Sequence, residues 1–264
     1  MPDFVRRFFV SCAQISEAYA ARMLMKFGCD WRKIGHKGRC MKGFERTYRK
    51  GRRQMVERKA FLKAYNIDED DFNAADISWE ELAAIYDDYL SKEEKLRGIG
   101  KDFVNDYLYD IERAGIHSYR YRTKDPGHLI EKIIRKRNEH FERFEDINRG
   151  NYHKYITDLI GIRVFFLYRE DWIHFHKYIT SVFENNPDLY VVDRIKDFDE
   201  DTGHYYIAER PKVYRRNGDT RIYDENLIEI KSNGIYRSLH YIIKYKGYYV
   251  EIQGRTCSRR AGVR

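Results

Sequence analysis

The chain has 264 residues, of which 42% are hydrophobic and 35% charged, and this balance excludes a disordered chain. The formal net charge of +8 suits a polyanionic partner such as a nucleotide or RNA. The sequence has no apolar run of membrane-spanning length, no recognisable secretory signal, and no cysteine pair at the short spacing of a zinc or redox motif, so we expect a cytoplasmic protein without membrane contacts.

Residues 1–74 are predicted to form a basic helical extension. Apolar residues recur at helical spacing over 5–27 and 52–66, and Lys and Arg crowd between Arg32 and Lys63. A charge run of this kind is most often a solvated helix surface, and an RNA contact surface is the alternative interpretation.

Two more helices are predicted before the character of the chain changes near residue 115. The sequence Ser-Trp-Glu-Glu that begins at Ser78 has the pattern of a capping box. It predicts a helix that runs to about Tyr89. Another helix is predicted over Phe103–Ala114.

Beyond residue 115, short strands alternate with helices. Alternating or β-branched runs predict strands, and amphipathic runs bounded by Pro, Gly or Asn predict helices. Lys246 and Gly247 indicate a tight hairpin turn between the last two strands. This order of elements predicts an α+β fold, with a mixed sheet of about five strands flanked by helices. The extended segments are 116–123, 159–168, 190–195, 205–209, 212–216, 227–230, 239–245 and 248–253, and the helices are 128–143 and 171–184.

Two carboxylates lie in or beside apolar strands. Asp158 precedes the run LIGIR, and Glu251 lies within YVEIQ. A carboxylate in such a place is costly unless it is paired or bound to a cation. On adjacent strands, the two carboxylates would offer an oxygen-rich site for Mg²⁺.

Basic side chains accompany these carboxylates. Arg122 and Lys124 are two residues apart in an extended stretch, so they point the same way. Lys132 and Lys136 are four residues apart on one helix face, and Arg163 lies on the predicted strand that follows Asp158. Each of these residues alone would be interpreted as a solvent-exposed side chain. Together, however, they have the charges that a polyphosphate site requires.

The segment 233–240 has the features of a nucleotide-binding loop. Gly234 permits close backbone approach, and Tyr236 offers a flat face to a base. Ser238 and His240 supply hydrogen-bonding groups.

The chain contains, in this order, the segments YRTKDPGHLIEK (121–132), ITDLIGIRV (156–164), YRSLHY (236–241) and VEIQGRT (250–256). Together they resemble the signature segments of the RelA/SpoT alarmone synthetase domain. The resemblance covers about residues 75–256. It implies a nucleotidyltransferase-like synthetase fold and a magnesium-dependent pyrophosphokinase.

The resemblance also implies roles for individual residues. Asp158 matches the family's metal-binding aspartate, and Glu251 matches a glutamate that binds the metal or activates the acceptor hydroxyl as a base. The residues matched to ATP are Arg122 and Arg163 beside the adenine and Lys124 and Lys132 near the phosphates, and the acceptor-binding residues are Tyr236, which stacks on guanine, Ser238 and His240.

The implied reaction is attack of a ribose 3′-hydroxyl on the β-phosphorus of ATP, with AMP leaving and with GDP or GTP as the acceptor. A toxin-like transfer to the 3′ end of tRNA is an alternative. It is favoured by the basic stretch and by Ile235, which separates Gly234 from Tyr236 where the family has them adjacent. A truncated remnant that binds nucleotide or RNA without turnover is a third reading. Residues 1–75 lack the His-Asp pair of the family's hydrolase domain, so no hydrolase is predicted.

Two kinds of protein partner follow from the same resemblance. Small members of the family often assemble into tetramers, so a homo-oligomer is expected. A toxin-like activity would imply an antitoxin partner.

The tail 257–264 differs from the family's usual continuation. One choice of codons for this tail, read one nucleotide earlier, encodes Leu-Phe-Glu-Glu-Gly-Trp-Ser-Glu, which resembles that continuation. We therefore expect a shift of reading frame near Thr256.

Overall fold

The structure is a computed structural model that describes residues 57–190, 203–216, 222–232 and 237–257. All of these belong to one compact unit, Gln54–Arg264. The predicted helix over 5–27, most of the basic stretch, most of the segment 190–195, Tyr236 and the end of the tail lie outside the described residues.

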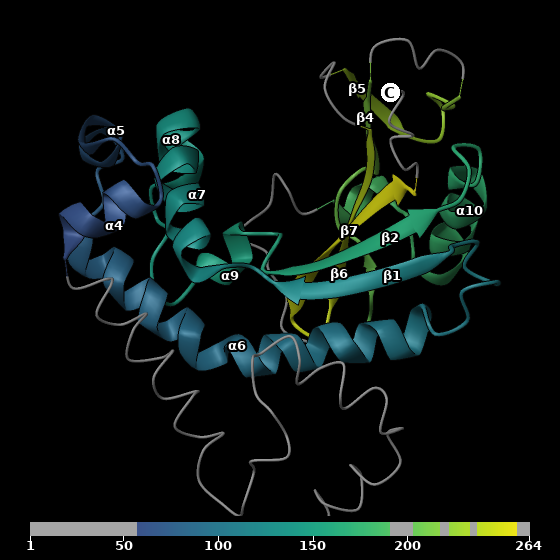
Figure 1. The fold of residues 1–264 in the computed structure, drawn as a ribbon, viewed down its shortest axis with the longest axis horizontal. Helices are drawn as coiled ribbons and strands as arrows, with labels where there is room; N and C mark the ends of the chain where they lie inside the picture. Colours follow the sequence, from purple (N-terminus) through teal and green to yellow (C-terminus); the bar gives the residue numbers. More distant parts are fainter. Residues whose placement is uncertain (1–56, 191–202, 217–221, 233–236, 258–264) are drawn as a thin grey trace, which may run out of the picture. The chain divides into compact units, whose positions relative to one another are not determined.

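The helices occupy three positions along the chain, before, between and after the first two strands (Figure 1). The short helices α4 and α5 precede the long helix α6, and α7, α8 and α9 separate the first two strands. Helix α10 follows the second strand. The bounds are α4 Arg58–Ala64, α5 Glu69–Ala74, α6 Trp79–Tyr107, α7 Pro126–Glu139, α8 Phe141–Phe144, α9 Tyr152–Tyr155 and α10 Trp172–Val182, with a 3₁₀ turn at Pro187–Leu189.

A mixed sheet carries the strands, which confirms the predicted α+β class. Within the described residues it has seven strands rather than about five, in the order β1-β2-β7-β6-β4-β5, with β3 paired to β6. Strands β2 and β7 are parallel, as are β4 and β5, and the other pairs are antiparallel. The bounds are β1 Ser118–Thr123, β2 Ile160–Phe166, β3 Tyr206–Ile207, β4 Lys212–Arg215, β5 Glu229–Ser232, β6 Ser238–Tyr245 and β7 Tyr248–Thr256.

Local signals account for several element boundaries. The Ser78 hydroxyl accepts a hydrogen bond from the main chain of Glu81, as the capping box predicts. Lys246 and Gly247 have φ of 47° and 75°, so the predicted hairpin turn between β6 and β7 is confirmed. The Asp125 carboxylate caps α7 by accepting hydrogen bonds from the main-chain amides of Gly127 and His128.

The prediction of a separate helix over Phe103–Ala114 is wrong, although its first residues, 103–107, are helical. Residues 103–107 are the last turns of α6, which runs without interruption from Trp79, and the chain then turns through Gly115, whose φ is +66°. Gly100 lies within α6 and lets this helix approach β1 and β2 closely, because a Cβ there would lie 3.2 Å from Ile160.

The two faces of the sheet differ in what covers them. Helices α6 and α10 lie against one face, where Phe103 of α6 contacts Tyr245 of β6 and Phe175 of α10 contacts Tyr241. These side chains are fully or almost fully buried. The candidate site lies on the opposite face. Arg122 of β1 and Glu251 of β7 lie on this face, on either side of Gly161 of β2.

The buried Arg137 connects the helical segments near the end of α7. Its guanidinium donates hydrogen bonds to main-chain carbonyls on two sides of the helix. The carbonyls belong to Ala75 and Asp76, between α5 and α6, and to Phe144 and Glu145, at the end of α8. Because the planar guanidinium has several N–H donors and reaches all of these acceptors, it fixes α7 between the two segments.

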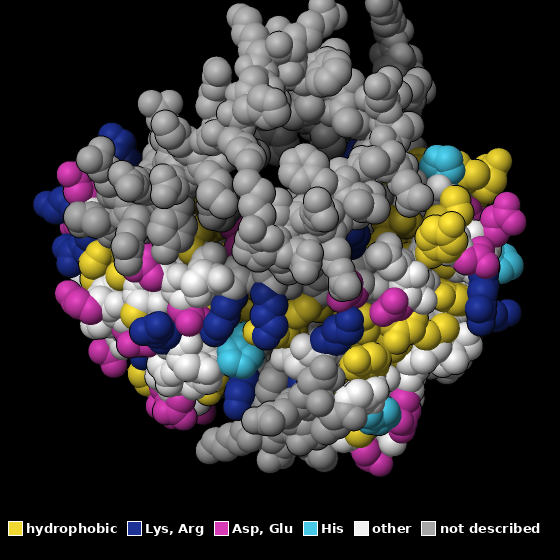
Figure 2. Space-filling model, turned by 90° about the horizontal axis from the view of Figure 1, so that it is seen from below, with side chains coloured by type: hydrophobic (Ala, Val, Ile, Leu, Met, Phe, Trp, Pro, Cys, Tyr) yellow, Lys and Arg dark blue, Asp and Glu magenta, His cyan; other side chains and the backbone are white. Residues whose placement is uncertain are grey.

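The surface on the side of α6 carries charges of both signs. Lys and Arg side chains lie among Asp and Glu side chains and small hydrophobic areas there (Figure 2). This mixture is typical of a solvated surface. None of the helices in the described ranges is long and apolar enough to cross a membrane.

Candidate active site

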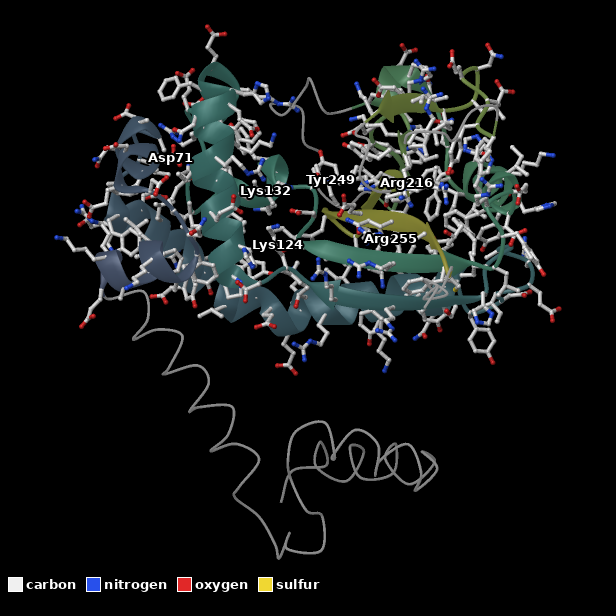
Figure 3. The ribbon with its side chains drawn as sticks, turned by 45° about the horizontal axis from the view of Figure 1, so that its top comes forward. Asp71, Lys124, Lys132, Arg216, Tyr249 and Arg255 are labelled. Atoms are coloured by element: carbon white, nitrogen blue, oxygen red, sulfur yellow. The ribbon has the colours of Figure 1, made fainter. Side chains whose placement is uncertain are left out.

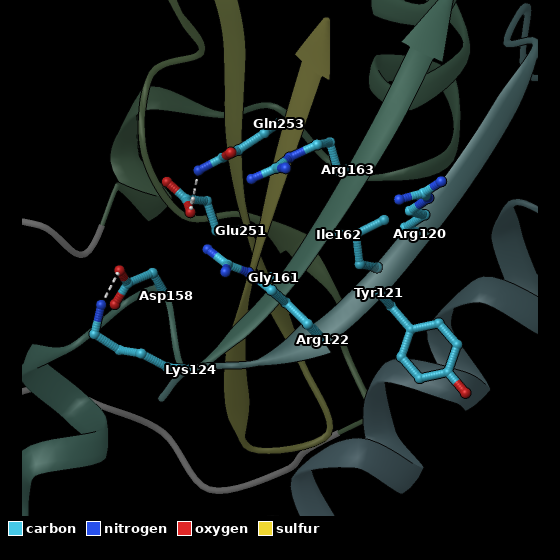
Figure 4. Close-up of a pocket in the computed structure, with 10 residues that line it drawn as sticks. All are labelled: Arg120, Tyr121, Arg122, Lys124, Asp158, Gly161, Ile162, Arg163, Glu251 and Gln253. Atoms are coloured by element: carbon cyan, nitrogen blue, oxygen red, sulfur yellow. Dashed lines mark hydrogen bonds and ion pairs between the residues drawn. The ribbon is translucent and has the colours of Figure 1, made fainter. Parts of the chain in front are cut away.

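A pocket of about 270 Å³ opens on the face of the sheet that α6 and α10 leave uncovered (Figure 4). It lies over β1, β2 and β7. Its lining contains Arg120, Tyr121, Arg122, Lys124, Asp158, Gly161, Ile162, Arg163, Glu251 and Gln253. The structure therefore brings both predicted carboxylates and three of the predicted ATP-binding residues, Arg122, Lys124 and Arg163, to one place.

The register of the three strands explains how this floor is built. Gly161 of β2 lies between Arg122 of β1 and Glu251 of β7. Residues paired directly across a sheet point to the same face. Since Gly161 has no side chain, the floor between the guanidinium and the carboxylate stays open. A Cβ at this glycine would have only ordinary contacts, 3.8 Å from Arg122.

Asp158 is held by two ammonium groups. Its Oδ2 lies 2.8 Å from Nζ of Lys124 and 3.0 Å from Nζ of Lys132. Burial acts to raise the pKa of the Asp158 carboxyl, but Lys132 and Lys124 outweigh it and hold the pKa below the ordinary value. The carboxylate is therefore charged at neutral pH. Its other oxygen, Oδ1, is buried and has no hydrogen-bond partner among the described residues.

Three elements bring this group together. Lys124 follows the end of β1, Lys132 lies on α7, and Asp158 precedes β2. Figure 3 shows Lys124 and Lys132 next to each other where α7 meets the end of the sheet. The Tyr89 hydroxyl of α6 donates a hydrogen bond of 2.6 Å to the Lys124 carbonyl and so fixes the main chain there.

Glu251 has a different environment, although its side chain is about as exposed as that of Asp158, at 17% against 19%. Its Oε1 lies 3.1 Å from Nδ1 of His240, and its Oε2 accepts a hydrogen bond of 2.9 Å from the Gln253 amide. Because a carboxylate only accepts, Nδ1 of His240 carries the proton in this pair. Two donors thus orient the Glu251 carboxylate, which forms no ion pair with a lysine or arginine of the described residues.

Guanidinium groups crowd beside the carboxylates. Burial is the largest cause that lowers the pKa of Arg163, and neighbouring cations add to it. These neighbours are Arg255, Arg122 and Arg120, while Glu251 acts in the opposite direction. Such mutual repulsion is relieved by a bound anion. This part of the pocket is therefore suited to an anionic ligand.

The predicted acceptor residues are only partly placed. His240 joins the site through Glu251, but its Nε2 is buried and has no partner among the described residues. Ser238 lies two residues before His240 on β6, is fully buried, and does not line the pocket. Tyr236 lies outside the described residues. An acceptor role for these residues stays a prediction.

Sequence reasoning missed Arg120, Gly161 and Gln253. Arg120 lies two residues before Arg122 on β1, and Gln253 lies two residues after Glu251 on β7. The two-residue period of a strand, which was applied to Arg122 and Lys124, would have placed both of them on the same face.

The predicted magnesium ion fits the carboxylates in part. Within the described residues, no group of three or more His, Cys, Asp and Glu side chains is arranged to hold a metal ion. Asp158 and Glu251 line the same pocket, and Oδ1 of Asp158 is a buried acceptor without a partner. Carboxylate oxygens are the ligands that Mg²⁺ prefers, together with the oxygens of a bound phosphate. Two protein carboxylates with substrate oxygens therefore suit this ion.

Comparison with protein families gives a match over more than half of the chain. Residues 121–262 match the model of the "Region found in RelA / SpoT proteins". The match contains every residue of the pocket lining except Arg120. No curated protein gives a significant match to the sequence.

Solved structures give more distant similarities. The small alarmone synthetase 1 from Bacillus subtilis, bound to its product pppGpp, is 17% identical, with 64% of this chain and 69% of that chain covered and a TM-score of 0.32. A GTP pyrophosphokinase family protein from Streptococcus pneumoniae is 20% identical, with 68% and 70% covered and a TM-score of 0.29. These values add nothing to the family match.

Proposed function

Since the matched region spans more than half of its length, the chain belongs to the RelA/SpoT family, and from this membership we propose that it is an ATP-dependent pyrophosphokinase. The proposed reaction transfers the β,γ-diphosphate of ATP to the 3′-hydroxyl of GDP or GTP and makes (p)ppGpp. The observation that carries the proposal is the single pocket that combines Asp158 and Glu251 with a surplus of cationic side chains.

The cationic side chains fit the donor nucleotide. Arg122 and Arg163 project from neighbouring strands over the pocket floor, where they are proposed to flank the adenine. Lys124 and Lys132 lie together beside Asp158 and are proposed to bind the phosphates. Phosphoryl transfer depends mainly on positioning and on charge stabilisation, and these four residues would supply both.

The carboxylates are given different tasks. Asp158, with its unpartnered Oδ1, and Glu251 are the residues that would hold Mg²⁺. When bound, the ion would offset the charge of the polyphosphate. Glu251 is also the candidate base, because His240 and Gln253 orient its carboxylate and no lysine or arginine of the described residues forms an ion pair with it.

The bonds change as follows in the proposed step. The acceptor 3′-oxygen forms a bond to the β-phosphorus of ATP, and the bond from that phosphorus to the α,β-bridging oxygen breaks. AMP leaves with the bridging oxygen. The proton of the hydroxyl passes to Glu251, which His240 and Gln253 hold in place.

The test uses the purified full chain with γ-labelled ATP, Mg²⁺ and one acceptor at a time, namely GDP, GTP or deacylated tRNA. Label on GDP or GTP with release of AMP is the expected result. Label on tRNA would replace the nucleotide acceptor by the toxin-like reaction, which the basic stretch of the sequence favours. Label on none of the three would contradict the proposed enzyme and favour a remnant that only binds nucleotide or RNA.

Two kinds of partner follow from the proposal and can be tested with the same protein. A homo-oligomer is checked by the mass of the protein in solution. An antitoxin partner is relevant only if label appears on tRNA.

A further inference from the structure

The ion pairs of Asp158 point to a control on metal binding. We propose that Lys124 and Lys132 keep Asp158 from binding a metal ion until a polyphosphate draws the two ammonium groups away, so that the divalent ion enters only together with the nucleotide. This inference rests on the proposed function, because it assigns ATP and Mg²⁺ to the pocket. It goes beyond it by setting the order in which they bind.

The first argument is geometric. One oxygen of Asp158, Oδ2, contacts both ammonium groups at 2.8 and 3.0 Å. The side chains of Lys124 and Lys132 are only 15% and 19% exposed, so water screens these contacts weakly. A divalent ion that approached the carboxylate would lie close to both ammonium groups. The like charges would therefore oppose its binding.

The second argument is the charge of the whole pocket. Cationic groups outnumber the carboxylates Asp158 and Glu251. The cations are Arg120, Arg122, Lys124 and Arg163 in the lining and Lys132 beside it. Without a ligand the pocket thus favours anions, and a free metal ion meets a repulsive field.

The third argument concerns what a polyphosphate changes. A lysine ammonium is a mobile point charge on a flexible stem, so it can exchange a carboxylate for a phosphate oxygen. After this exchange Asp158 has two free oxygens, because its Oδ1 already lacks a hydrogen-bond partner among the described residues. The phosphates would also contribute their own oxygens to the ion. The same two lysines would then serve first to exclude the metal and later to hold the donor.

Binding of Mn²⁺, used in place of Mg²⁺ and followed by electron paramagnetic resonance, tests the proposal without turnover. The nucleotide-free wild-type chain should show no saturable site over the concentrations tested. The double variant Lys124→Met, Lys132→Met should show a saturable site whose dissociation constant is at least about tenfold below the highest Mn²⁺ concentration at which the wild type shows none. Adding Asp158→Asn to the double variant should remove this gain. Equal affinity of the wild type and the double variant for Mn²⁺ alone would overturn the proposal.

Lys136→Met is the matched control. Lys136 lies one turn further along α7 and pairs with Glu139 instead of Asp158, so its loss should leave Mn²⁺ binding unchanged. A gain equal to that of the double variant would mean that any lost positive charge has the same effect, and would also overturn the proposal.

A measurement on the wild type guards against a double variant that does not fold. Calorimetry in EDTA should show saturable binding of an ATP analogue with a methylene group between the α- and β-phosphorus. A separate titration with Mn²⁺ alone, in buffer without EDTA, should show no saturable binding. Saturable Mn²⁺ binding that Asp158→Asn abolishes would contradict the inference. These titrations need no transfer, so they can succeed when the labelled-ATP assay fails, and they can fail when that assay succeeds.

Discussion

The two faces of the sheet are built by alternate residues of the same strands, yet their properties differ. On the covered face, Phe103 of α6 and Tyr245 of β6 pack in a fully buried aromatic cluster. On the open face, the neighbouring residues of β1, β2 and β7 carry charges around a pocket. A substitution on the covered face should therefore change mainly stability, and one on the open face mainly activity, and three predictions test this division.

The largest effect is expected from the open face. Glu251→Gln keeps the size of the side chain but removes the charge, so transfer should fall by about 10²- to 10⁴-fold if the residue is the general base. The melting temperature should change little, because glutamine has the same shape and can still accept a hydrogen bond from His240 or Gln253. The labelled-ATP assay and a thermal melt check both statements. Activity within twofold of wild type would remove Glu251 from the proposed mechanism.

The next effect is expected from the covered face. Phe103→Ala should lower the free energy of unfolding by about 3–5 kcal/mol, because Phe103 is fully buried and its ring stacks on Phe183 and meets Tyr245 edge-on. Denaturant unfolding measures this loss. The KM for ATP of the folded fraction should stay near that of the wild type. A large rise of that KM with unchanged stability would contradict the idea that the covered face determines stability and the open face determines activity.

Two glycines give a smaller and more direct test. Gly161→Leu should raise the KM for ATP by roughly tenfold, about 1.4 kcal/mol, because the new side chain fills the pocket floor. Its stability should change little, since a Cβ there meets Arg122 only at 3.8 Å and the rest of the leucine side chain extends into the pocket.

Gly254→Ala is the matched control on the covered face. Its Cβ would lie 2.7 Å from the ring of Phe166, so stability should fall while the KM for ATP is kept. The comparison is made by steady-state kinetics and thermal melts of both variants. If Gly254→Ala raised the KM and Gly161→Leu did not, the assignment of the faces would be reversed.

The smallest effect is a dependence of stability on pH. Burial first, and then Lys92, Lys154 and Lys244, lower the pKa of His153 to about 4 from the ordinary 6.5. The unfolded chain therefore takes up this proton more readily than the folded one. The stability that the neutral His153 side chain contributes is complete above pH 6.5 and is lost as the pH falls towards about 4.

Thermal melts between pH 7.5 and 5 measure this contribution. His153→Gln should have a weaker dependence on pH over that window than the wild type, because the variant lacks the group that titrates. An identical dependence in both proteins would show that other groups are responsible.

The sequence predicts the strands and part of the site because both depend on short-range patterns. The two-residue period placed Arg122 and Lys124 together, the apolar run after Asp158 forms β2, and the turn residues Lys246 and Gly247 form the hairpin. Asp158 and Glu251 were selected because they lie in or beside apolar strands, and the resemblance to the family segments then implied their roles.

Other features depend on contacts that no local pattern encodes. The pairing of Lys124 with Asp158 joins residues 34 positions apart. The continuity of α6 was missed because Gly98 and Gly100 each weaken a helix intrinsically. At Gly100 the close contact with Ile160 of β2 and Tyr121 of β1 accounts for the glycine, and this contact cannot be seen in the local sequence. The role of Gly161 as an open floor follows only from the register of three strands.

The contacts of the Arg137 guanidinium affect the geometry of the pocket. Lys132 lies on the same helix, little more than one turn from Arg137, so the distance over which its ammonium reaches Asp158 depends on where that helix is anchored. The anchoring carbonyls belong to two segments outside the sheet, the connection between α5 and α6 and the end of α8. Sequence changes in those segments, which do not line the pocket, would therefore change the position of the Lys132 ammonium and with it the proposed affinity for ATP.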